Sequence, residues 1–131
     1  MGNVTGYDVL RASPYGYDTT TGLGFNMMKF NITGSELKRG LELIFALTTD
    51  NVSYFPQFAG LRFDYDKTLP VGQRVISSSM FVNDTAFSGT TNYSATANQG
   101  LLLALSQLGL QITNLTPTFT PEYTCIKNFV S

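Results

Sequence analysis

The chain has 131 residues, a length that suits one domain with a single sizeable core. Its 8 Lys and Arg against 9 Asp and Glu give a formal net charge of -1, so it lacks the basic surface that nucleic-acid binding or a polybasic membrane module requires. Hydrophobic residues make up 43% and charged residues 13%, which predicts a globular chain whose surface is rich in Ser, Thr and Asn.

The residue types that are missing exclude several chemistries. There is no histidine, which excludes Ser-His-Asp and Cys-His catalysis and Cys/His zinc sites. The one cysteine, Cys125, cannot form an intrachain disulfide and is interpreted as a small buried hydrophobe. No apolar run reaches the roughly 18 residues of a membrane span, and residues 1–7 lack the pattern of a signal peptide. Without histidine or a second cysteine, the chain is poor material for a hydrolase that acts alone.

The first half of the chain predicts a short helix, a strand and a long helix, in that order. Residues 6–13 suit the short helix, which Pro14-Tyr15-Gly16 ends before a loop over 16–24. Residues 25–32 alternate between apolar and polar and predict a strand. Thr33 and Glu36 then have the spacing of a capping box, so we expect a helix to about Thr48.

The long helix shows one apolar stripe at helical spacing, which predicts the side that faces the core. Its members are Leu37, Leu41, Ile44 and Phe45. Lys38 and Glu42 are four residues apart, and we place both on the outer face.

The second half is dominated by short strands. We predict strands over 61–66, 74–82 and 93–97, with a hairpin turn within 81–87. Asn98 is placed to cap a helix over 100–110, residues 114–118 suit a loop, and Pro121 suits the start of a last helix to about residue 130. This order predicts a single α+β domain in which helices pack on a mixed or mostly antiparallel sheet.

Three features of the sequence are weak candidates for a binding site. Asp64 and Asp66 share one face of a predicted strand and could hold a cation, but a solvated face beside Arg62 is the favoured interpretation. The glycines of the 16–24 loop lead into a strand and not a helix, so they lack the setting of a phosphate-binding loop. Tyr15 and Tyr17 lie in the segment bounded by Pro14 and the glycines, where a flat amphipathic ring can serve as a binding surface.

The sequence has more Asn-X-Ser/Thr sequons than its composition explains. Six are present, against about two expected by chance for this content of Asn, Ser and Thr. The excess favours a glycosylated protein that is secreted or on the cell surface, and the alternative is an Asn/Thr-rich bacterial surface protein. Asn31 lies at a predicted strand end and is left out of the glycosylation candidates, which are Asn3, Asn51, Asn83, Asn92 and Asn114.

Four stretches of the chain resemble the C-terminal domain of the 5'-nucleotidase / UDP-sugar hydrolase family. Gly2-Asn-Val-Thr5 and the following predicted helix resemble its Gly-x-Ile-Thr start, and Ser13-Pro14-Tyr15-Gly16 resembles its Leu-Pro-Phe-Gly turn. The stretch from Phe30 to Leu37-Lys38 resembles its strand-Gly-x-x-Leu-Lys pattern. Residues 57–75 resemble its Gln-x-Ser-Gly, Tyr-Asp and Pro-Gly-x-Arg-Val series in order, and the resemblance weakens after about residue 97.

The resemblance implies a division of labour within a longer parent chain. An N-terminal metallophosphoesterase domain would hold two divalent metal ions, while this domain would bind the nucleoside or nucleotide substrate and have no catalytic or metal-binding residues of its own. The aromatic residue of the family's turn stacks on the base, and it corresponds to Tyr15, followed by Gly16. A stacked base contributes on the order of 1–3 kcal/mol.

The chain also departs from the family pattern. A second stacking aromatic and a Gly-Gly-Asp-Gly segment are replaced by the stretch around Asn98 and Gly100, which we retain as a candidate second loop. The family's Asn-Gly-Gly-x-Arg motif has no counterpart, so we expect residues 1–131 to form one domain that is truncated at its N-terminus. Two functions follow: nucleoside recognition without catalysis, or a degenerate structural or interaction module that kept the fold and lost the ligand.

Overall fold

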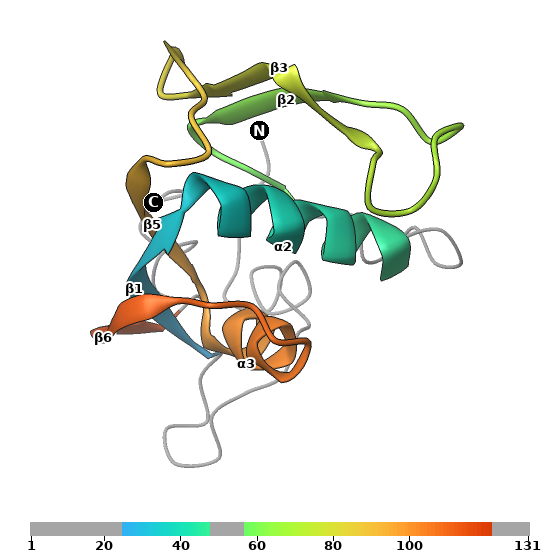
Figure 1. The fold of residues 1–131 in the computed structure, drawn as a ribbon. Coiled ribbons are helices and arrows are strands. Elements are labelled where there is room, and N and C mark those ends of the chain that lie inside the picture. Colours follow the sequence, from blue (N-terminus) through green and yellow to red (C-terminus); the bar gives the residue numbers. More distant parts are fainter. Residues whose placement is uncertain (1–24, 48–56, 122–131) are drawn as a thin grey trace, which may run out of the picture.

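The computed structural model describes residues 25–47 and 57–121. In this part of the chain, two helices and two three-stranded antiparallel sheets form a single α+β domain, which confirms the predicted fold class (Figure 1). The strands divide between two sheets where the pattern predicted one. The first sheet has the order β5-β1-β6 and the second β2-β3-β4. The early helix, the Tyr15 turn, Cys125 and residues 122–130 lie outside the described residues.

The element bounds agree closely with the predicted ranges, except after residue 112. The helices are α2 (Gly34–Leu47) and α3 (Gln99–Gln107). The first sheet contains β1 (Asn26–Thr33), β5 (Asn92–Asn98) and β6 (Thr113–Pro121). The second contains β2 (Leu61–Tyr65), β3 (Val75–Val82) and β4 (Thr85–Ala86), with Asn83 and Asp84 in the predicted hairpin turn, both with positive φ.

Helix α2 lies between the two sheets and contributes to two separate clusters of buried residues (Figure 1). Ile44 belongs to one cluster with Met28, Phe30 and Ile32 of β1 and with Leu102 and Leu105 of α3. Leu41 and Phe45 pack instead with Val75 and Met80 of β3. The predicted stripe is therefore real but serves two cores, because its members point to two neighbouring sides of the helix.

Glu42 does not lie on the outer face of α2, where its spacing from Lys38 predicted it. Its side chain lies in the interior, with the residue only 7% exposed, and not on the outer face. Its carboxylate oxygens accept hydrogen bonds from the backbone amides of Arg74 at 3.1 Å and Val75 at 2.7 Å, where β3 begins. A buried carboxylate must be hydrogen-bonded, and here the bonds join α2 to the second sheet.

The start of α2 follows half of the capping-box prediction. The Thr33 hydroxyl accepts a hydrogen bond from the Glu36 amide at 3.3 Å. The Glu36 carboxylate instead accepts a hydrogen bond from the Gln111 amide at 2.9 Å and pairs with Arg39. Thr33 therefore caps α2 at the end of β1, while Glu36 connects α2 to the segment before β6.

Strand β6 replaces the loop predicted over 114–118 and ends at Pro121. The remainder of the helix predicted from Pro121 lies outside the described residues. The strand pairs with β1 and contains register shifts, one of them around Asn114, whose φ is 52°. Edge strands tolerate proline and bulges because one side of the strand donates to no neighbour. The Thr-rich sequence between the prolines supplies the β-branched residues that favour extended backbone.

Candidate functional site

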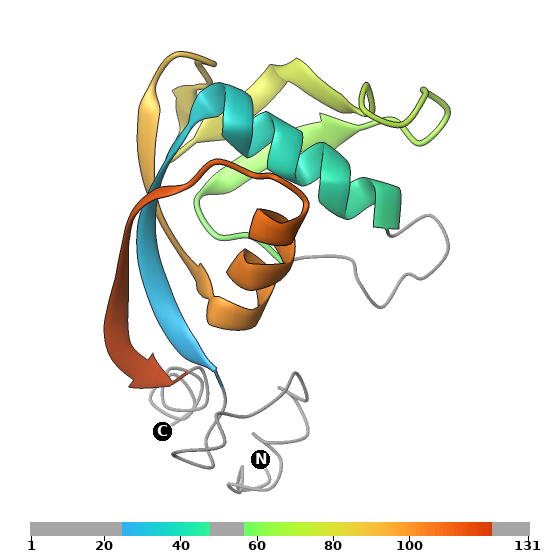
Figure 2. The same ribbon diagram turned by 60° about the horizontal axis from the view of Figure 1, so that its bottom comes forward.

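The candidate second loop lies at one end of the first sheet, where β5 passes into α3. Strands β1 and β5 pair antiparallel, with Met27 opposite Asn98. Continuing this register by two residues places Phe25 opposite Gly100. Figure 2 shows the resulting arrangement, with the start of β1 beside the start of α3.

Asn98 is the N-cap of α3, as the sequence predicted. Its Oδ1 accepts a hydrogen bond from the Gly100 amide at 2.7 Å. This bond satisfies one of the amides that the first helical turn leaves without a backbone partner. The Asn98 side-chain oxygen therefore has a structural role, and the candidate second loop is the N-terminus of α3.

Gly100 lies against the ring of Phe25. A Cβ atom built on Gly100 would be 2.9 Å from Cε2 and 3.1 Å from Cδ2 of that ring. Any larger residue at position 100 would displace the ring, so the glycine permits this close approach. Phe25 is partly buried, and no sequence motif contains it as a candidate site residue. The strand register was the signal that could have found it.

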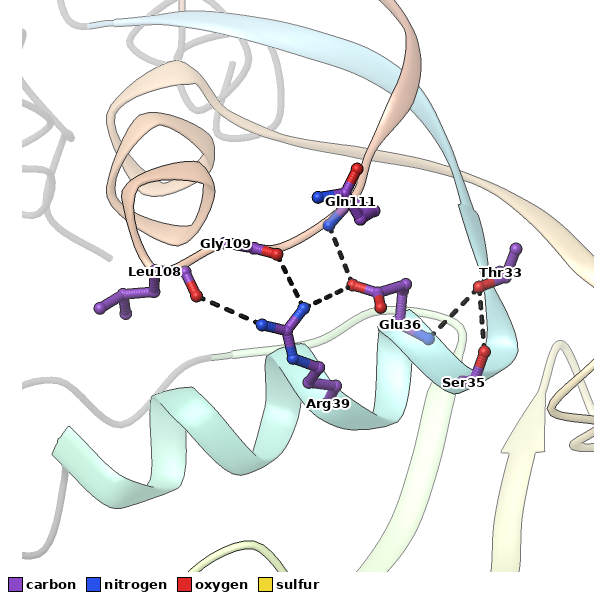
Figure 3. Close-up of polar contacts among 7 residues, drawn as sticks. All are labelled: Thr33, Ser35, Glu36, Arg39, Leu108, Gly109 and Gln111. Carbon is purple, nitrogen blue, oxygen red and sulfur yellow. Dashed lines mark hydrogen bonds and ion pairs between the residues drawn. The ribbon is translucent and has the colours of Figure 1, made fainter.

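The far end of α3 is held by side chains of α2 (Figure 3). Arg39 Nη1 donates to the carbonyl oxygen of Gly109 at 2.8 Å and to the Glu36 carboxylate at 3.0 Å, and Nη2 donates to the carbonyl oxygen of Leu108 at 3.4 Å. A guanidinium at a helix C-terminus also interacts favourably with the helix dipole. These contacts orient α3 and so position the helix start that carries Gly100.

The two carboxylates near the end of β2 have different surroundings. Asp64 is exposed, while Asp66 lies just past the strand end and accepts hydrogen bonds from the Thr68 hydroxyl at 2.6 Å and the Thr68 amide at 2.8 Å. These bonds, the hydroxyl first, lower the pKa of Asp66 below its ordinary value. Within residues 25–47 and 57–121, no three His, Cys, Asp or Glu side chains gather as potential metal ligands.

A shallow pocket of about 300 Å³ opens on the other sheet, away from Asn98 and Gly100. It is lined by Phe45, Gln57, Phe58, Leu61, Arg62, Phe63 and Tyr65. Its rings mostly contact one another, with Phe45 and Tyr65 centroids 4.4 Å apart and Phe58 and Phe63 centroids 5.7 Å apart. We interpret it as the edge of the second core.

The structure tests the accessibility of three glycosylation candidates. Asn83, Asn92 and Asn114 are exposed, at a hairpin turn and at the starts of two strands. Asn31, which the sequence analysis left out, is partly buried in the central strand of its sheet. Asn3, Asn51, Tyr15 and Gly16 lie outside the described residues. Neither α2 nor α3 is long and apolar enough to cross a membrane.

Comparison with solved structures identifies the fold. The 5'-nucleotidase precursor from Thermus thermophilus matches with a TM-score of 0.79 at 17% identity, over 97% of this chain and 24% of that one. The NAD nucleotidase of Haemophilus influenzae matches with a TM-score of 0.63 at 19% identity, over 96% of this chain and 24% of that one. The chain thus spans about a quarter of both proteins.

The sequence comparison extends the result from fold to family. No curated protein matches the chain in a sequence search. The family described as "5'-nucleotidase, C-terminal domain" matches residues 1–107, a segment that includes the Tyr15 turn and the start of α3. The chain therefore belongs to the family of 5'-nucleotidase C-terminal domains.

Proposed function

We propose that this domain recognises the nucleoside part of a nucleotide substrate and does not hydrolyse it alone. The observation that carries the proposal is the family match over residues 1–107, which includes both Tyr15 and the segment from Asn98 to Gly100. The names of the two similar structures, a 5'-nucleotidase and an NAD nucleotidase, favour a nucleotide as the substrate class.

We assign each part of the proposed function to particular residues or to a partner domain. Tyr15, followed by Gly16, supplies a flat ring on which a base stacks, and Asn98 and Gly100 form the second part of the site. Hydrolysis is assigned to an N-terminal metallophosphoesterase domain of the same parent chain, where two divalent metal ions would supply the activated water. The absence of histidine from this sequence supports that assignment.

A structural or interaction module is the second candidate, and one observation favours it. The Asn98 side chain caps α3, and Gly100 packs on Phe25, so the segment from 98 to 100 serves the fold even without a ligand. In this case the domain would pair with its N-terminal domain or a second subunit and bind no nucleoside.

A binding experiment separates the two candidates. Adenosine is titrated by calorimetry into the 131-residue chain, into Tyr15→Ala, and into Phe58→Ala as a control just before β2. Nucleoside recognition predicts that only Tyr15→Ala weakens binding, by roughly tenfold for a stacking contribution of about 1.4 kcal/mol. Equal affinity for the wild type and Tyr15→Ala, or no binding at all, favours the structural module.

A hydrolysis assay tests the division of labour. We expect the 131-residue chain to release no phosphate from AMP when Mg²⁺, Mn²⁺ or Zn²⁺ is supplied. Phosphate release that follows the protein through purification would show that the chain contains its own catalytic site.

We also propose that the protein is secreted or displayed on a cell surface and carries N-linked glycans. The sequon excess and the exposure of Asn83, Asn92 and Asn114 support this proposal. Asn3 and Asn51 are proposed on sequence alone.

A further inference from the structure

One of the six sequons has an aromatic residue two positions before its asparagine. Phe81 precedes Asn83 in this way, within the hairpin of β3 and β4. The corresponding residues of the other five sequons are not aromatic, and they are Met1, Lys29, Thr49, Thr90 and Ile112. A glycan on Asn83 would therefore start close to a ring that the other sequons lack.

Phe81 lies on the face of the second sheet that points away from α2. Its neighbour Met80 is buried in the core that this sheet shares with α2, and successive residues of a strand point to opposite faces. Figure 1 shows α2 along one side of β2 and β3. The Phe81 ring is nevertheless only half-buried, so a large apolar surface is available on the outer face of the sheet.

Phe81 and Arg62 together form a platform on this outer face. The two residues are directly opposite each other in the β2–β3 register, and Arg62 Cζ lies 4.6 Å from the centroid of the Phe81 ring. The Arg62 side chain is 68% exposed, and its Nη1 is 3.9 Å from Oδ1 of the exposed Asp84. Because an exposed pair of this kind contributes little, it leaves the guanidinium accessible to a further acceptor.

The hairpin turn places the Asn83 side chain beside this platform. Asn83 and Asp84 have φ values of 47° and 61°, the left-handed pair that a type I′ turn requires. A Cβ built on Gly60 would be 2.5 Å from Asn83 Oδ1, so the missing side chain of Gly60 makes room for the Asn83 amide. Gly60 is two residues before Arg62, and alternate residues of an extended chain share a face.

We propose that the first sugar of an N-linked glycan on Asn83 packs on Phe81 and Arg62 and stabilises the second sheet. The inference rests on the proposed glycosylation and deepens it, since it gives one glycan a structural role. The C–H face of an N-acetylglucosamine ring suits an aromatic surface, and its hydroxyl and acetyl oxygens accept hydrogen bonds from a guanidinium. The covalent link is the ordinary one: Asn83 Nδ2 bonds to C1 of the sugar, the diphosphate of the lipid-linked donor leaves, and the amide loses one proton.

The tether explains why such a weak contact can stabilise the fold. The sugar is held beside the ring by its bond to Asn83, so it pays little of the entropy that a free sugar would lose on binding. Asn92 offers the matched control, because it is equally exposed but follows Thr90 instead of an aromatic residue.

A set of variants made in two hosts tests the proposal. The wild type, Asn83→Gln, Phe81→Leu and the double variant are secreted from a eukaryotic host and also produced in a bacterial host that attaches no N-glycans. We expect the unfolding midpoint to fall by about 3 °C more for Asn83→Gln in the eukaryotic set than in the bacterial set. This excess should vanish in the Phe81→Leu background, which has no ring, and Asn92→Gln should show no excess.

Two further measurements use the wild-type chain. An endoglycosidase that leaves one N-acetylglucosamine on each asparagine should preserve the extra stability, because only the first sugar contacts the ring. NMR should show the C–H resonances of that sugar on Asn83 shifted upfield by the ring current of Phe81. This readout does not depend on the folding of a variant, and unshifted resonances would overturn the proposal.

The outcomes separate this inference from the glycosylation on which it rests. Mass spectrometry of the secreted chain first shows whether Asn83 carries a glycan. If it does, and the midpoints show no excess or an excess that persists in Phe81→Leu, the inference fails and the proposed glycosylation stands. If Asn83 carries no glycan, the inference and the proposed modification of Asn83 fail together.

Discussion

Glu42 shows how one buried acceptor joins two parts of the molecule. It accepts from the amides of Arg74 and Val75, so replacing it leaves two amides at the start of β3 without these partners. We expect Glu42→Ala to lower the free energy of unfolding by about 2–3 kcal/mol, since an unsatisfied buried donor costs roughly 1–3 kcal/mol. Urea denaturation measures the change. Asp64→Ala, which removes an exposed carboxylate, should stay within about 0.5 kcal/mol. Similar losses in both variants would refute the structural role of Glu42.

The Asp66 carboxyl makes the stability of the folded protein depend on pH, in a direction that its hydrogen bonds determine. Its pKa is lowered in the folded state by the Thr68 hydroxyl and then by the Thr68 amide. Its stabilising contribution is therefore present above the ordinary Asp pKa and is lost as the pH falls through the lowered folded value. Thr68→Val removes the hydroxyl and keeps the amide, so the Asp66 pKa should rise part of the way to its ordinary value. A carboxyl-carbon NMR titration that gave the same pKa for both proteins would contradict this assignment.

At the scale of elements, α2 tests whether helix propensity or packing decides the effect of a substitution. A Cβ at Gly34 would overlap the carbonyl oxygen of Ser88, whereas a Cβ at Gly40 would meet only the Leu110 side chain at 3.3 Å. Ala is favoured over Gly in a helix by about 1 kcal/mol, but overpacking against backbone costs about 1–3 kcal/mol. We therefore expect Gly34→Ala to be destabilising by about 1–3 kcal/mol and Gly40→Ala to be nearly neutral. Thermal unfolding of the two variants measures which one is less stable. Equal midpoints would show that the loop after β4 shifts to accommodate the new methyl group at little cost.

For the whole molecule, the sequons predict a pattern of modification. When the chain is secreted from a eukaryotic host, we expect glycans on Asn83, Asn92 and Asn114, because all three are exposed at turns or strand ends. Each Asn→Gln change at these positions should remove one step of glycosidase-sensitive mass. Asn31→Gln should remove no glycosidase-sensitive mass, since Asn31 pairs with strands on both sides. Glycans on Asn31, or on none of the three exposed positions, would overturn the pattern.

Much of the local structure could be predicted because it depends on neighbouring residues. The Thr33 and Asn98 caps, the apolar stripe of α2, and the turn at Asn83 and Asp84 all follow from contacts within a few positions. Strand β6 could not be predicted in this way, since its prolines indicate a loop until β1 is known to lie beside it. The residues of the candidate site also differ in whether local sequence could identify them. Asn98 and Gly100 were selected from motif order, while Phe25 depends on the pairing of two strands about seventy residues apart.

By itself, the sequence determined the α+β class, the bounds of α2, the start of α3 and the family resemblance, because periodicity, capping spacing and motif order are encoded along the chain. The tertiary structure alone decided that α2 serves two cores, that Glu42 lies inside, and that Phe25 contacts Gly100. Each of these depends on which distant segments become neighbours. That choice is made by the burial and hydrogen bonding of the whole chain, which local spacing does not specify.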